Sequence, residues 1–320
     1  MQILITGSQG FIGCYLMQAL RDKGYSVCGL DTRSRSTPTG DYRLIEGNIL
    51  DKDASRRAMD GVDCIIHLAA VHRDDGIPTQ MYFEVNERGT QTLLECASEM
   101  GIDKFLFYSS AAIYGLPGKA TEGNIPHPAT PYGASKLEAE AAVKAWTVDA
   151  PRRSAIIIRP AAIFGPENYA NIYRLISKVA DGKFRWVGKG DNIKSVAYVE
   201  NLVAATLFLI DRMEPGVETY NYSDDPQLTL KQLVDLISEK AQVPAARFHI
   251  PFPVALLAGG MLDILGRLLR HNFDIKTSRL RKFRMHSEYP ADRIRSLGFH
   301  QRFTLEKGIE KTVRWYLNTR

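Results

Sequence analysis

The alternation of short apolar segments with helical patterns in the first half of the chain constrains the fold most. Five segments have the character of strands: ILIT (3–6), SVCGL (26–30), CIIHLAA (64–70), KFLFYSS (104–110) and SAIIIRP (154–160). Their hydrophobicity has no period of two, which is typical of strands that are covered on both faces. Helical patterns lie between them, near 11–23, 51–60, 79–100 and 131–148. This alternation predicts an α/β fold with a doubly wound parallel sheet.

The rhythm breaks after FGPEN (164–168). The helices expected near 168–181, 200–212, 229–240 and 304–317 are separated by loops that contain glycine and proline. We therefore expect a smaller, mainly helical lobe that lies over the carboxyl edge of the sheet.

Composition excludes several classes of protein. The chain of 320 residues is 45% hydrophobic and 24% charged, which is ordinary for a soluble globular protein. The net charge of +5 suits a phosphate-bearing ligand or an anionic membrane surface, and no nucleic-acid-binding signature accompanies it. The four cysteines show no CxxC spacing, so we expect reduced core residues and no metal site. Met1 runs directly into a strand and no long uncharged apolar run follows, so we expect a cytoplasmic protein.

A glycine-rich turn follows the first expected strand. In TGSQGFIG (6–13) the glycines Gly7, Gly10 and Gly13 are spaced GxxGxxG. Such a turn lets the backbone approach a pyrophosphate, and the free amides of the following helix attract it. Asp31 ends the second strand, where a carboxylate can accept both ribose hydroxyls of NAD and repel the 2′-phosphate of NADP. Arg33 and Arg35 lie close by and leave NADP open as the alternative.

Five motifs occur in an order and spacing that resemble a known family. They are TGSQGFIG, HLAA (67–70), YSSAAIYG (108–115), PYGASK (131–136) and RPAAIFGP (159–166). Together they resemble the extended short-chain dehydrogenase/reductases, called NAD-dependent epimerase/dehydratases, over essentially the whole chain. The resemblance implies a Rossmann domain that binds NAD, with Ser110, Tyr132 and Lys136 as catalytic residues. The cofactor contacts that we predict are Gly7, Gly10, Phe11, Ile12, Gly13, Asp31, Arg33, Asn48, Ile49, Leu68, Ala69 and Ala70, besides Tyr132 and Lys136.

The resemblance also implies a domain division and a dimer. We expect residues 1–165 and about 195–222 to form the NAD-binding domain, with about 166–194 and 223–320 in the substrate-binding lobe. A homodimer would form through the helices near 79–100 and 131–148.

The spacing of Tyr132 and Lys136 supports their expected role. They are four residues apart, so they lie on one face of a helix. A free tyrosine has a pKa near 10, and lowering it by about three units asks for roughly 4 kcal/mol. A lysine ammonium and an oxidised nicotinamide together make that plausible. Tyr132 would then act as a base toward a sugar hydroxyl, and Ser110 would donate a hydrogen bond to the same oxygen.

The residues after Ser110 indicate which reaction is possible. Sugar dehydratases of the family carry an Asp-Glu pair there, whereas this chain has Ala111 and Ala112, which cannot move a proton. What remains is transient oxidation, and 4-epimerisation is the simplest outcome. A net dehydrogenation, as in the sterol dehydrogenases of the superfamily, would use the same residues. A protein that binds NAD as a sensor without turnover is a third reading, which the intact catalytic set opposes.

The substrate is expected to be a diphosphate-linked sugar. LAAVHRDD (68–75), NIYRLISKVADGKF (171–184) and VGKGDNIKSVAYVEN (187–201) resemble bacterial 4-epimerases of N-acetylglucosaminyl-diphospho-undecaprenol, which serve O-antigen assembly. UDP-sugar 4-epimerases are the alternative, although Ala162 replaces their frequent asparagine and their Arg-x-Gly-Asp segment is missing. The substrate contacts that we predict are His72, Arg73, Ala111, Asn171 and Lys194.

One stretch suits a lipid carrier. PVALLAGGMLDILGRLLR (253–270) is apolar apart from Asp263, Arg267 and Arg270, and residues 267–284 hold seven Lys/Arg against one acid. An apolar helix followed by a basic cluster is typical of contact with an anionic membrane. A core helix of the small lobe or a dimer contact is the alternative.

Overall fold

The computed structural model describes the chain apart from residues 34–41, 73–75, 116–117, 246–248, 258–259 and 262–284. Its centre is a seven-stranded sheet in the order β11-β7-β5-β4-β1-β2-β3, and all its pairings are parallel. The strands are β1 (Gln2–Thr6), β2 (Ser26–Asp31), β3 (Arg43–Glu46), β4 (Cys64–His67), β5 (Lys104–Tyr108), β7 (Ser154–Pro160) and β11 (Gly216–Tyr222). The predicted α/β class and all five predicted strands are confirmed. The two outermost strands, β3 and β11, were not among the strands predicted.

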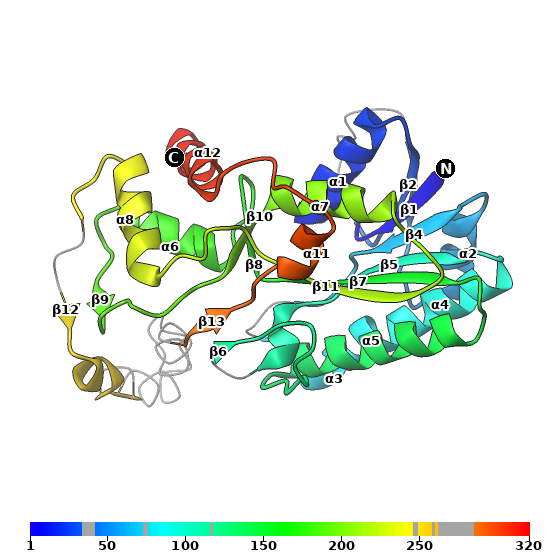
Figure 1. Ribbon diagram of the computed structural model, residues 1–320, viewed down its shortest axis with the longest axis horizontal. Helices are drawn as coiled ribbons and strands as arrows, with labels where there is room; N and C mark the ends of the chain where they lie inside the picture. Colours follow the sequence, from blue (N-terminus) through cyan, green and yellow to red (C-terminus); the bar gives the residue numbers. More distant parts are fainter. Residues whose placement is uncertain (34–41, 73–75, 116–117, 246–248, 258–259, 262–284) are drawn as a thin grey trace.

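Helices cover both faces of this sheet (Figure 1). One face carries α1 (Phe11–Asp22) and α7 (Val199–Ile210), which pack against each other. The other carries α2 (Lys52–Met59), α4 (Gly89–Glu99) and α5 (Pro131–Val148). The helix predicted over 79–100 is confirmed, and it contains a π-helical turn: it runs through α3 (Thr79–Tyr82), η1 (Phe83–Arg88) and α4 without a break.

The order of the strands creates a crevice at the carboxyl edge of the sheet. The chain places β2 on one side of β1 and β4 on the other. The loops that leave β1 and β4 therefore diverge, and such a switch point is where doubly wound sheets bind their ligands. The predicted glycine turn lies at this point.

Most of the remaining elements lie beyond this edge of the sheet, whereas α11 (Asp292–Ser296) packs against β11 (Figure 1). The other helical elements are η2 (Ala111–Tyr114), α6 (Asn171–Ala180), α8 (Leu230–Lys240) and α12 (Leu305–Asn318). Three short parallel pairs join β8 (Ala162–Phe164) to β10 (Val196–Tyr198), β9 (Trp186–Val187) to β12 (His249–Ile250), and β6 (Gly118–Lys119) to β13 (Ser287–Glu288).

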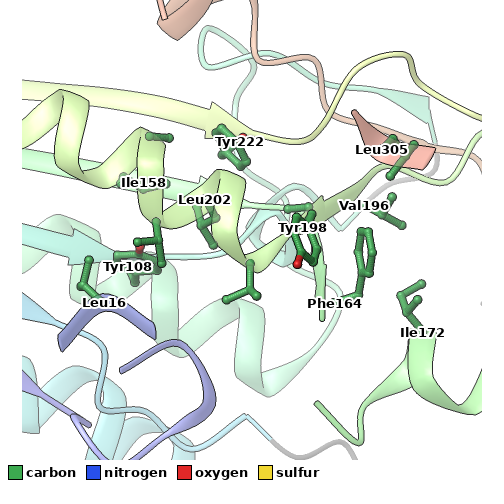
Figure 2. Packing of buried hydrophobic residues seen from close by; sticks show 14 of the residues in the cluster. Leu16, Tyr108, Ile158, Phe164, Ile172, Val196, Tyr198, Leu202, Tyr222 and Leu305 are labelled. Carbon is green, nitrogen blue, oxygen red and sulfur yellow. The ribbon is translucent and has the colours of Figure 1, made fainter. Parts of the chain in front are cut away.

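One apolar core joins the sheet to these outer elements. Figure 2 shows Tyr108 and Ile158 of the sheet, Leu202 of α7, Ile172 of α6 and Leu305 of α12 in one cluster of buried side chains. A buried leucine or isoleucine contributes about 1.5–3 kcal/mol, so this continuity fixes the outer elements against the sheet. No helix within the described ranges is long and apolar enough to cross a bilayer.

Candidate active site

The glycine turn after β1 has no room for side chains. Gly7 has a φ of +72°, and a Cβ there would lie 2.8 Å from the amide nitrogen of Ala69. A Cβ on Gly13 would lie 2.3 Å from the carbonyl oxygen of Gly7. Gly10 is the N-cap of α1 and provides no side-chain cap to the first turn. The amides of that turn are therefore available to a pyrophosphate, and the residues present fit a dinucleotide.

Asp31 is held at the edge of this turn. Its Oδ2 accepts a hydrogen bond from the amide of Gln9 at 2.9 Å, and its Oδ1 accepts one from the amide of Arg33 at 3.1 Å. The carboxylate is only 7% exposed, whereas the Arg33 side chain is 65% exposed. Two fixed amides orient the carboxylate at the end of β2, where a ribose would be recognised.

The other predicted cofactor contacts are divided between core and surface. Ile49 is buried, and Asn48 is exposed with its Oδ1 accepting a hydrogen bond from the amide of Leu50. Leu68, Ala69 and Ala70 are half-buried in the loop after β4, and the amide of Ala69 donates to Thr6 Oγ1 at 3.3 Å.

Ser110 and the start of α5 are brought together by a close backbone approach. Gly133, the residue after Tyr132, is so near η2 that a Cβ there would lie 2.6 Å from the carbonyl oxygen of Ala112. Ser110 Oγ accepts a hydrogen bond from the amide of Ala112 at 3.1 Å. Among the described residues this hydroxyl has no acceptor of its own, so its proton can be donated to a substrate oxygen. The Tyr132 ring packs edge-on against Tyr82 at 6.4 Å.

Lys136 is buried beneath Tyr132. It is 2% exposed, and its Nζ lies 4.1 Å from the centre of the Phe107 ring. Burial lowers the pKa of Lys136 to about 7, and Glu140 opposes that shift. Burial, together with the charge of Lys136, holds the pKa of His67 well below its usual range. His67 is therefore neutral at pH 7, and Lys136 needs an anionic neighbour to remain an ammonium.

Asn86, in the π-helical turn, supports this site and was not singled out from the sequence. Its Oδ1 accepts from the amide of Val71 at 2.8 Å, and its Nδ2 donates to the Val71 carbonyl and to Ser135 Oγ, both at 2.9 Å. Ser135 Oγ donates in turn to the Tyr132 carbonyl. The loop after β4 and the first turn of α5 are thereby joined. No local sequence signal marks Asn86, because its burial and its partners appear only in the folded chain.

The predicted substrate contacts are more dispersed. Ala111 is buried at the start of η2, His72 and Asn171 are exposed, and Arg73 lies outside the described residues. Asn171 is the first residue of α6. Lys194 Nζ donates to the carbonyl of Met285 at 2.6 Å, and burial lowers its pKa to about 8. Asn171 begins α6, whereas Lys194 lies in the segment between β9 and β10.

Comparison with known proteins establishes the family. The profile of the "NAD dependent epimerase/dehydratase family" matches residues 3–222. The chain belongs to this family. Family membership confirms the predicted enzyme class, the Rossmann fold and NAD as the cofactor.

Individual relatives and a solved structure are similar to the chain over nearly its whole length. The chain is 35% identical to an N-acetyl-alpha-D-glucosaminyl-diphospho-ditrans,octacis-undecaprenol 4-epimerase of Escherichia coli O157:H7. The alignment covers 98% of the chain and 94% of that relative. It is 26% identical to a UDP-glucose 4-epimerase of Vibrio cholerae, covering 98% of the chain and 95% of that relative. The crystal structure of the Thermus thermophilus UDP-glucose 4-epimerase with NAD superposes with a TM-score of 0.76 at 21% identity, covering 100% of both chains.

Proposed function

We propose that this family member is a 4-epimerase of a diphosphate-linked N-acetylhexosamine, with a polyprenyl carrier favoured over UDP. The observation that carries the proposal is the pair Ala111 and Ala112 directly after Ser110. Two methyl side chains at the entrance to η2 provide no acid or base for eliminating water. Oxidation and reduction at one carbon need only Ser110, Tyr132, Lys136 and the cofactor.

The proposed chemistry begins and ends at the Tyr132 phenol. When bound, NAD would supply the chemistry of hydride acceptance and hydride return at C4. Tyr132, as the phenolate, removes the proton of the C4 hydroxyl while C4 loses its hydride, and the C–O bond becomes a ketone. Ser110 donates a hydrogen bond to that oxygen throughout. After the ketone has turned in the site, Tyr132 would give the proton back to the oxygen as C4 is reduced on its other face. Lys136 stabilises the phenolate by its charge.

In the proposed complex NAD would lie at the glycine turn, and the sugar diphosphate with its carrier would lie at the outer elements. Gly7, Gly10 and Gly13 with the first turn of α1 would hold the pyrophosphate, and Asp31 the adenosine ribose. The substrate diphosphate would lie between the start of α6, at Asn171, and Lys194. In this proposal residues 1–165 and about 195–222 are the cofactor domain, and the rest is the substrate lobe.

A lipid carrier is supported by the segment after β12. Residues 252–257 are helical, and Val254 and Leu257, three residues apart on one face, are 53% and 71% exposed. Met261 is also 71% exposed, while Ala255 is buried and anchors the segment. The basic cluster of 267–284 lies outside the described residues, but its sequence follows directly. Each basic residue near an anionic surface contributes about 1 kcal/mol, and exposed apolar side chains add to that. The relative from Escherichia coli acts on an undecaprenol-linked sugar, according to its name.

Paired substrates test the carrier. Epimerisation of polyprenyl-diphospho-N-acetylglucosamine in anionic vesicles should exceed that of UDP-N-acetylglucosamine, and the protein should co-sediment with the vesicles in a salt-sensitive way. Replacing Val254, Leu257 and Met261 together by serine should reduce vesicle binding without lowering turnover of a UDP-sugar. Leu297→Ser, at a leucine that is 45% exposed elsewhere, is the matched control. Brisk turnover of the UDP-sugar without vesicle binding would leave a nucleotide-sugar 4-epimerase.

We further propose a homodimer through the helical elements near 79–100 (α3, η1 and α4) and through α5, which pack against one another on one face of the sheet. Sedimentation equilibrium tests it directly, and a mass near 35.8 kDa at micromolar concentration would contradict it.

A further inference from the structure

A buried ion pair lies one helical turn beyond Lys136. Glu140 is completely buried, and both its oxygens accept from Arg159, Oε1 from Nε at 2.9 Å and Oε2 from Nη2 at 2.7 Å. Arg159, on β7, is 3% exposed. Burying two charges costs several kcal/mol per ion, and a pair of apolar residues would often be as stable. The position of this pair beside the catalytic helix therefore calls for an explanation beyond stability.

The pair also reaches the segment that carries Ser110. Arg159 Nη1 donates to the Tyr114 hydroxyl at 2.9 Å, and that hydroxyl donates to Asn221 Oδ1 at 2.7 Å. Tyr114 is the last residue of η2, which begins directly after Ser110. The network thus connects α5 and the Ser110 segment through side chains that water does not reach.

The charges of this buried group do not cancel. Lys136 and Arg159 are cationic when protonated and Glu140 is anionic, which leaves one unit of positive charge. Lys144 lies 3.7 Å from Glu140 Oε2, but it is 44% exposed and largely screened by water. His67, the titratable group that faces Lys136 from β4, is neutral, and Phe107 of β5 provides only its ring. The Tyr132 hydroxyl lies on the same face of α5 as Lys136, and its phenolate would balance the excess.

We propose that Glu140, held by Arg159, is a positioning residue that keeps Lys136 protonated so that Lys136 can stabilise the Tyr132 phenolate. Without Glu140, Lys136 would be a buried cation with Arg159 as a second cation nearby, and both circumstances favour the neutral amine. The inference rests on the proposed role of Lys136, but it concerns the charge of that residue, which can be measured without substrate.

The test is a titration of Lys136 in the protein without substrate. Lysine is labelled with ¹³C at Cε, the signal of Lys136 is assigned by its loss in Lys136→Met, and its shift is followed with pH by NMR. In Glu140→Gln we expect the pKa of Lys136 to fall by about one unit, as the loss of a nearby opposite charge predicts. Glu138→Gln, the same change on the exposed face of α5, should leave it unchanged.

Two further measurements distinguish an effect of charge on Lys136 from a purely structural effect. Arg159→Gln leaves Glu140 without its cation, so the pKa of Lys136 should rise, and this variant alone carries the test if Glu140→Gln does not fold. In turnover, Glu140→Gln should move the alkaline limb of the pH profile to lower pH with little change in KM, which a purely structural role would not do. An unchanged Lys136 titration in Glu140→Gln, or shifts of the same sign in both variants, would overturn the inference. If the titrations change as expected but the unaltered protein does not epimerise the sugar, the proposed function is refuted and the inference about Lys136 stands.

Discussion

Removing the Asp31 carboxylate should weaken NAD binding and reduce the preference of the protein for NAD over NADP. The carboxylate is nearly buried and is oriented by the amides of Gln9 and Arg33. A hydrogen bond to a charged group contributes about 1.5–3 kcal/mol, so Asp31→Ala should raise the Kd of NAD about 10- to 150-fold. The amide of Gln9 also loses its acceptor, which places the effect toward the upper end. For NADP, the repulsion of the 2′-phosphate disappears at the same time, so its affinity should fall less or rise.

Isothermal titration calorimetry with both dinucleotides measures these affinities at one ionic strength. Glu46→Ala is the matched control, because Glu46 is paired in register with Asp31 on the neighbouring strand but is exposed. The control should change both affinities little. Equal affinity of the unaltered protein for NAD and NADP, or a ratio unchanged in Asp31→Ala, would refute the reasoning.

Three other predictions concern the base, the glycine turn and a buried carboxyl. Tyr132→Phe should keep NAD bound in calorimetry and lose turnover by several orders of magnitude, and near-normal activity would remove Tyr132 as the base. Gly13→Ala should lower both NAD affinity and the unfolding midpoint, since overpacking typically costs about 1–3 kcal/mol, whereas Gly123→Ala has open space and should change neither. Burial raises the pKa of Asp224 from 3.8 to about 7. The stability that the protonated Asp224 contributes is therefore fully present below pH 3.8 and is lost as the pH rises through 7. The free energy of unfolding should fall by about 4 kcal/mol over this range. Urea unfolding at pH 5 and pH 8 should show a smaller difference in Asp224→Asn, and an unchanged difference would contradict this assignment.

The parts of the fold that the sequence predicted are those with strong local signals. The inner strands have apolar centres without a period of two because helices cover both faces, and their polar residues lie mostly at the strand ends. The bounds predicted for α5 agree because Thr130 caps the amide of Gly133 and Pro131 occupies the first turn. The edge strands lack such a signal. RLIE in β3 has charged ends, and GVETYNY in β11 mixes polar and apolar residues, since each has only one neighbouring strand.

The candidate site residues that the sequence singles out are those where chemistry and spacing coincide within one segment. The glycine turn and the Tyr132–Lys136 pair belong to that class. Glu140 and Arg159 could not be recognised in this way. Each has the sequence character of an ordinary surface charge, and their pairing depends on the packing of α5 against β7. Asn86 was missed for a similar reason, since its partners Val71 and Ser135 come from two other segments. Burial of polar side chains that are distant in sequence becomes visible only in the tertiary structure.

The fate of the hydrogen at C4 tests the central claim most directly. Polyprenyl-diphospho-N-acetylglucosamine carrying deuterium at C4 is incubated with the enzyme and NAD, and the released sugars are analysed by mass spectrometry. Transient oxidation and return of the same hydride predict a mixture of the gluco and galacto epimers, with deuterium retained at C4 and no net NADH. Steady accumulation of NADH with a ketone product would contradict the 4-epimerase and leave a dehydrogenase.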